Sequence, residues 1–137
     1  SIRLDVFFED GDTVYDIEIQ KADKGNLPRR TRMYSSMMDA NMLDKGLEYE
    51  QLKDSYVIFI CMFDPFHKGL TKYTFRSICE EDKGLPLGDG RCIMFLNTKG
   101  SVGDLSTNLD AFFGYLNGGI ESSLPATDDF LDFLGVD

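Results

Sequence analysis

Polar and apolar residues alternate along two short stretches near the N-terminus. In residues 2–9, the apolar side chains of one face are Ile2, Leu4, Val6 and Phe8. In residues 13–20, the side chains of one face are Val14, Asp16, Glu18 and Gln20. A period of two residues is typical of β-strands, and the intervening Asp10-Gly11-Asp12 is a strong turn sequence. The pattern therefore predicts a β-hairpin.

A helix is predicted over residues 29–43, where the sequence becomes rich in methionine. Its apolar stripe consists of Met33, Met37, Met38 and Met42, with Tyr34 and Ala40 beside it. Pro28 suits the first turn of a helix because that position needs no backbone N–H. Gly46 suits the residue just beyond the last turn.

Three more strands and a second helix are predicted downstream. Residues 56–63 are continuously apolar, which is typical of a central strand that is buried on both faces. Residues 70–79 alternate loosely, and residues 91–96 form a further short apolar stretch. Residues 102–116 carry an apolar stripe at helical spacing. This order of elements predicts an α/β domain built on a mixed sheet.

Composition limits the classes of function. The 137 residues suit a single domain, and no apolar stretch reaches the ~18–20 residues of a membrane span. The net charge of −10 counts against a nucleic-acid partner, because such proteins usually carry a basic surface. One dense basic group is present, and it comprises Lys21, Lys24, Arg29, Arg30 and Arg32.

The cysteines and the first residues bear on the cellular setting. The three cysteines have no CxxC spacing, which favours free buried thiols in a reducing cytoplasm over a zinc site. The first residues have neither the pattern of a signal peptide nor an initiator methionine, and they enter a strand pattern at once. We therefore expect that further residues precede Ser1.

The hairpin brings two acidic residues together. A turn centred between Gly11 and Asp12 pairs residues whose numbers add to 23. Asp5 then lies opposite Glu18, with Cβ atoms about 4.5–5.5 Å apart, and Gln20 shares the face of Glu18. Opposed like charges destabilise a hairpin, and Mg²⁺ would offset the repulsion because it binds carboxylates, water and phosphate. The residues alone leave a second interpretation open, in which the acids form a solvated strand face without a metal.

A series of short motifs carries a resemblance to a known family. Residues 3–6 (RLDV) precede the turn and residues 15–20 (YDIEIQ) follow it. Further matching segments are residues 27–34 (LPRRTRMY), 46–52, 56–66 (ending in FDPF) and 73–76 (YTFR). In this order and spacing, over residues 3–116, they resemble the PD-(D/E)XK nuclease family transposases, the Rpn-like group of that nuclease superfamily.

The resemblance implies a fold and an activity. The fold is an α/β, restriction-endonuclease-like mixed sheet flanked by helices, here lacking the N-terminal helix and strand of the superfamily. Residues 1–118 would form this core, and residues 119–137 an acidic C-terminal tail. The implied activity is that of a metal-dependent endodeoxyribonuclease that uses Mg²⁺ or Mn²⁺ to hydrolyse DNA phosphodiester bonds in transposition or recombination.

The resemblance also implies a role for each matched residue. Asp5, Glu18 and Gln20 would be catalytic, and the metal ligands would be Asp5, Glu18 and the backbone carbonyl of Ile19. Gln20 stands where the superfamily has a lysine; an amide can orient water or a phosphate oxygen but carries no charge. The residues implied to contact DNA are Arg29, Arg30, Arg32 and Tyr34.

Two other functions stay open at this point. One is a catalytically inactive DNA-binding or protein-interaction module that retains the nuclease fold. The other is an α/β binding domain whose acidic hairpin holds no metal. Metal binding would distinguish the nuclease from the binding domain without a metal. DNA cleavage would distinguish it from the catalytically inactive module. For the nuclease we expect a DNA partner, a cytoplasmic location and no membrane, and we leave homo-oligomer formation open.

Overall fold

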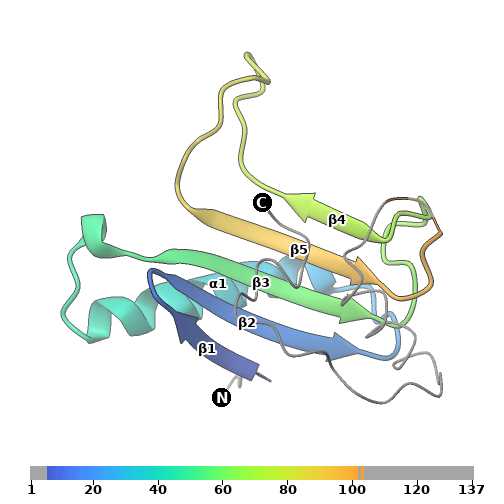
Figure 1. Ribbon diagram of the computed structural model, residues 1–137, viewed down its shortest axis with the longest axis horizontal. Coiled ribbons are helices and arrows are strands. Elements are labelled where there is room, and N and C mark those ends of the chain that lie inside the picture. The colour runs from blue at the N-terminus through green and yellow to red at the C-terminus, as the bar shows by residue number, and fades with distance from the viewer. Residues whose placement is uncertain (1–5, 102, 104–137) are drawn as a thin grey trace.

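The fold is a mixed five-stranded sheet with one long helix packed on one of its faces (Figure 1). The structure, a computed structural model, describes residues 6–101 and 103. The strands are β1 (Val6–Asp10), β2 (Thr13–Gln20), β3 (Asp54–Cys61), β4 (Lys72–Phe75) and β5 (Arg91–Asn97), in the spatial order β1-β2-β3-β5-β4. The helices are α1 (Leu27–Asp44) and the short 3₁₀ helix η1 (Tyr49–Gln51). This arrangement confirms the predicted α/β class.

The predicted hairpin and its register are confirmed over the described residues. β1 and β2 are antiparallel, and their paired residues range from Val6 opposite Ile17 to Asp10 opposite Thr13, so each pair adds to 23. Gly11 takes a positive φ of 60° in the turn, which costs a glycine little. Asp5 lies outside the described residues.

The three central strands run parallel, and β3 lies between β2 and β5. Seven of its eight residues are buried, which confirms the prediction of a central strand buried on both faces. β3 begins and ends two residues before the predicted range of 56–63. Its ladder with β2 explains the difference, because Thr13 pairs with Asp54 and Gln20 pairs with Cys61, so the length of β2 sets the bounds of β3.

The strand predicted over residues 70–79 is wrong in its extent. Only Lys72–Phe75 pairs with β5, as edge strand β4. The chain then leaves the sheet, and residues 76–90 project from it as an arm (Figure 1). A single bridge between Ile78 and Pro86 joins the two sides of this arm. The alternation in this stretch therefore reflects a narrow ribbon outside the sheet.

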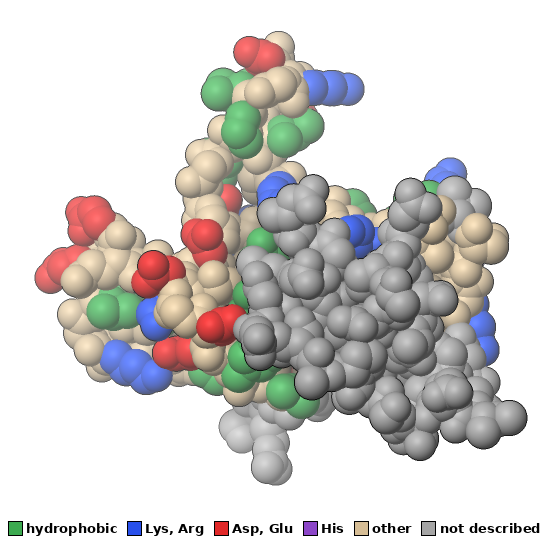
Figure 2. Space-filling model, viewed as in Figure 1, with side chains coloured by type: hydrophobic (Ala, Val, Ile, Leu, Met, Phe, Trp, Pro, Cys, Tyr) green, Lys and Arg blue, Asp and Glu red, His purple; other side chains and the backbone are tan. Residues whose placement is uncertain are grey.

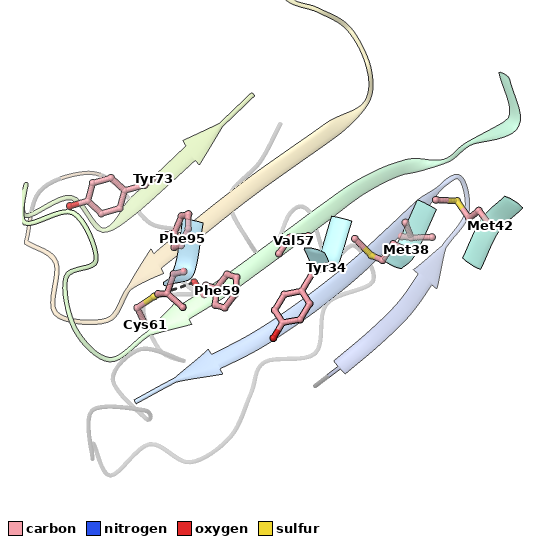
Figure 3. Packing of buried hydrophobic residues seen from close by; sticks show 10 residues of the cluster. Tyr34, Met38, Met42, Val57, Phe59, Cys61, Tyr73 and Phe95 are labelled. Carbon is pink, nitrogen blue, oxygen red and sulfur yellow. Dashed lines mark hydrogen bonds between the residues drawn. The ribbon is translucent and has the colours of Figure 1, made fainter. Parts of the chain in front are cut away.

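Helix α1 contains the predicted range, but its buried stripe differs from the predicted one. The buried residues are Leu27, Thr31, Tyr34, Ser35, Met38 and Met42. Met33, which was assigned to the core, is 48% exposed, and Tyr34 takes its place. Tyr34, Met38 and Met42 repeat every four residues and pack on Val57 and Phe59 of β3 (Figure 3). The ring of Tyr34, not the thioether of Met33, therefore faces the sheet.

The opposite face of the sheet is also apolar. Phe8, Tyr15 and Tyr56 form a ladder of stacked rings across three strands, with centroids 4.7 and 5.4 Å apart. Ile58 and Met94 on this face are fully buried. The second predicted helix, residues 102–116, and the predicted domain limit at residue 118 lie outside the described part of the chain.

Candidate functional site

Two carboxylates are buried on the face of β2 that looks toward α1. Every second residue of β2 lies on this face, as the period of two residues predicts; these residues are Val14, Asp16, Glu18 and Gln20. Asp16 is 0% exposed and Glu18 is 1% exposed. The solvated-face interpretation is therefore wrong for these two side chains. Burial of a carboxylate is costly unless it gains charged or hydrogen-bonding partners.

Asp16 was missed by the sequence analysis. It lies two residues before Glu18 on the same strand face, about 7 Å away along the strand. Its neighbours in the ladder are Phe7 of β1 and Val57 of β3. The alternation of β2 already placed Asp16 on the face of Glu18, so the signal was present. The predicted site rested on the pairing of Asp5 with Glu18 and did not include Asp16.

Gln20 ends β2 and is held by the first turn of α1. The guanidinium of Arg30 donates a hydrogen bond from Nη1 to Oε1 of Gln20 over 2.9 Å. The other end of the amide, Nε2, donates to the backbone carbonyl of Ile19 over 3.2 Å. The side chain of Ile19 points to the opposite face and is 44% exposed. The residues Glu18, Ile19 and Gln20 therefore present a carboxylate, a carbonyl and an amide within one short segment.

Arg30 is itself fixed by aromatic side chains. Its Nη2 and Nε donate to the hydroxyl of Tyr34 over 2.8 and 3.3 Å. Its guanidinium carbon lies 5.5 Å from the ring centroid of Tyr34 and 5.4 Å from that of Phe59. Tyr34 is 7% exposed and stacks on Phe59 at 5.9 Å. The buried Tyr34 therefore holds the guanidinium of Arg30 through its ring and its hydroxyl.

The structure separates the three arginines that were assigned to DNA contact. Arg30 is half-buried and touches Gln20, whereas Arg29 and Arg32 are exposed on α1. The absence of an acidic residue in the first turn of α1 leaves this end of the helix basic. Arg29 and Arg32 are therefore accessible to phosphate, whereas Arg30 contacts Gln20 at the end of β2.

The donors on β2 suit a hard divalent cation. Mg²⁺ is usually bound by one or two carboxylates together with water and substrate phosphate. Glu18 and Asp16 can supply carboxylates from this face, and Ile19 a carbonyl oxygen. Within residues 6–101 and 103, no group of three or more His, Cys, Asp or Glu side chains is close enough to hold a metal ion. Mg²⁺ sites on phosphates combine a few protein ligands with water and substrate.

Comparison with known proteins shows the family of this chain. Residues 1–108 match the sequence profile of the PD-(D/E)XK nuclease family transposases. No curated protein and no solved structure matches the chain. Among the described residues, no helix has the length and apolar character needed to cross a membrane. Because the match covers most of the 137 residues, the chain belongs to the PD-(D/E)XK nuclease family transposases.

Proposed function

We propose that this protein is a metal-dependent endodeoxyribonuclease that hydrolyses DNA phosphodiester bonds during transposition or recombination. The observation that carries the proposal is the buried carboxylate of Glu18. Two residues further along β2, the amide of Gln20 is hydrogen-bonded to Arg30 of α1. Family membership supports a nuclease. The buried acid and the arginine-bound amide support a site that binds a cation and a phosphate together.

Each residue of the site has a distinct part in this proposal. Glu18, the carbonyl of Ile19 and Asp5 would hold Mg²⁺ or Mn²⁺. Such a cation would supply polarisation of the phosphodiester and a lower pKa for a water molecule. Gln20 positions that water or a phosphate oxygen through its amide. The exposed guanidinium groups of Arg29 and Arg32 bind backbone phosphates beside the site.

We place this reaction in the cytoplasm. Cys61 and Cys92 are buried free thiols, and Cys79 is a partly exposed one. Burial raises the pKa of Cys61 to about 12, with the charges of Asp23 and Asp64 adding to the effect. A thiol of this kind packs as an apolar side chain and needs no disulfide partner.

Cleavage of supercoiled plasmid by the full chain tests the proposal. We expect nicking in Mg²⁺ or Mn²⁺ and none in EDTA. Glu18→Gln keeps the size of the buried side chain but removes its charge, and Asp5→Ala removes the second ligand. Each should reduce cleavage by at least ~100-fold and weaken Mn²⁺ binding in calorimetry. Glu80→Ala, an exposed acid on the arm, is the matched control and should cleave as the wild type does.

The same assay decides between the alternatives. A wild-type protein that binds DNA but never cleaves it would support the catalytically inactive module instead. Cleavage that persists in both Asp5→Ala and Glu18→Gln would show that these acids do not hold the cation, and the assignment of the site would be wrong.

A further inference from the structure

The side chain of Gln20, a neutral amide, ends β2 and accepts a hydrogen bond from the guanidinium of Arg30. Hydrolysis of a phosphodiester at this end of β2 would need a positive charge to stabilise the negative charge of the transition state. We propose that Arg30 supplies this charge through Gln20, so that the pair performs the task of a single lysine. The inference rests on the proposed nuclease function and names the group that stabilises the transition state within it. Arg30 acts here as a positioning residue for Gln20 and the scissile phosphate.

The geometry of the Gln20 amide follows from the chemistry of its partner. A guanidinium has only donors, so the amide oxygen must face Arg30, as the 2.9 Å contact shows. The NH₂ group consequently points away from Arg30, toward the carbonyl of Ile19 at 3.2 Å. One of its two N–H groups binds that carbonyl, and the other is left to donate to a water molecule or a phosphate oxygen. A cation on the oxygen also strengthens the amide as a donor.

The guanidinium of Arg30 is held rigidly enough to fill this role. The hydrogen bonds to Gln20 and Tyr34 use three of its five N–H groups. The rings of Tyr34 and Phe59 shield the cation from water, which strengthens its field compared with an exposed arginine.

Arg30 and the buried acid Glu18 share one neighbour, Phe59 of β3. Phe59, on which the guanidinium rests, is the ladder neighbour of Glu18 in the pairing of β2 with β3. The charge therefore comes from α1, although the acid and the amide come from β2. Arg30 lies four residues before Tyr34 on α1, which is the spacing that lets the two side chains meet.

Exchange of the charge between the two positions tests the inference. The variants are Arg30→Met, Arg30→Lys, Gln20→Lys and the double variant Gln20→Lys/Arg30→Met. Arg76→Met, an exposed arginine on the arm, is the control for removal of a cation. Single-turnover cleavage of supercoiled plasmid in Mn²⁺ is measured as a function of pH, together with Mn²⁺ affinity and thermal unfolding of each variant.

We expect Arg30→Met to slow cleavage by about 100- to 1,000-fold, the usual effect of removing one transition-state donor, with Mn²⁺ affinity unchanged. The double variant should recover at least tenfold of this loss. Its rate should also fall at alkaline pH as the new lysine deprotonates, below its ordinary pKa of about 10.4 if it is desolvated. The wild type should show no such fall, because arginine stays protonated.

The outcomes separate this inference from the proposed function. A wild type that never cleaves DNA removes the proposed function, and this inference with it. A wild type that cleaves, with Arg30→Met within threefold of it or with no recovery in the double variant, overturns the role of Arg30 alone. If Arg30→Met does not fold, Arg30→Lys decides: an alkaline loss of rate supports the role, and a wild-type pH profile overturns it.

Discussion

Asp64 anchors the loop that leads from β3 to β4. Its Oδ1 accepts hydrogen bonds from the backbone N–H groups of Phe66 and His67 and from the hydroxyl of Tyr73, over 3.2, 3.0 and 2.7 Å. Its Oδ2 accepts from the N–H of Gly69 over 2.7 Å. His67 adopts a positive φ of 59° within this loop. One side chain therefore satisfies three backbone groups and fixes a conformation that His67 does not favour by itself.

These hydrogen bonds make the stability of the protein depend on pH. Burial alone would raise the pKa of Asp64, but the hydrogen bonds from Tyr73 and the backbone outweigh it, so this pKa is lowered. The stabilisation is therefore present above the ordinary aspartate pKa and is lost as the pH falls through the lowered one. Asp64→Asn cannot accept on both sides, because its NH₂ would face an N–H group.

We expect Asp64→Asn to lower the free energy of unfolding near neutral pH by about 1 kcal/mol for each hydrogen bond that is lost. The difference from wild type should begin to narrow below the ordinary aspartate pKa of about 4, because the unfolded protein then becomes protonated. It should narrow further until the pH has passed through the lowered pKa of Asp64 in the folded protein. Urea unfolding at several pH values measures this. A difference that stays constant down to about pH 2 would show that the carboxylate charge is not what holds the loop.

At the scale of elements, α1 shows how a helix of mixed composition selects its buried face. Met33 and Met38 belong to the same methionine-rich stretch, yet Met33 is 48% exposed and Met38 is 1% exposed. Their burial differs because Tyr34, and not Met33, packs on the ring of Phe59. Once the tyrosine is placed, the residues that follow it at intervals of four must also face the sheet.

This difference predicts unequal costs for the same substitution. Met38→Ala should lower the free energy of unfolding by about 2–5 kcal/mol, because it leaves a cavity between α1 and β3. Met33→Ala is the matched control and should change it by less than about 0.5 kcal/mol. Chemical denaturation of the two variants measures both values. Equal effects would show that α1 is rotated relative to the sheet from the position described here.

At the scale of the whole molecule, the sheet and the arm differ in what supports them. β3 pairs with a strand on each side and is buried along nearly its whole length. The arm of residues 76–90 exposes apolar side chains (Figure 2). Ile78 is 51% exposed, Leu85 54% and Leu87 68%. Its two sides are paired at the bridge between Ile78 and Pro86. On either side of this bridge, the backbone N–H of Cys79 donates to the carbonyl of Leu85, and that of Leu87 donates to the carbonyl of Ser77.

Hydrogen exchange should reveal this difference. We expect the amides of β3 to exchange most slowly, because they open only when the sheet unfolds. The amides of the arm should exchange fastest, because a single β-bridge pairs its two sides and even a two-stranded hairpin is marginally stable by itself. Mass spectrometry of peptides covering residues 54–61 and 77–87 measures both. Comparable protection in the two peptides would show that the arm is stabilised by contacts beyond those described.

The local features of this protein could be predicted from its sequence. The hairpin register, the eight residues of β2 and the common face of Glu18 and Gln20 follow from a two-residue period and a glycine turn. The buried central strand follows from its continuous apolar run. Each of these features depends on residues that are close together in the chain, so the local sequence is enough to predict the feature.

Tertiary structure decided which side chains meet. The burial of Asp16, the end of β4 at Phe75 and the contact of Arg30 with Gln20 depend on how α1 and β5 dock against β2 and β3. Docking is set by the shapes of many side chains that are distant in the chain, among them Tyr34 and Phe59. The periodicity of α1 predicted Met33 in the buried stripe, with Tyr34 beside it. The packing of the Tyr34 ring on Phe59 decided otherwise, and the same packing brought Arg30 to the end of β2.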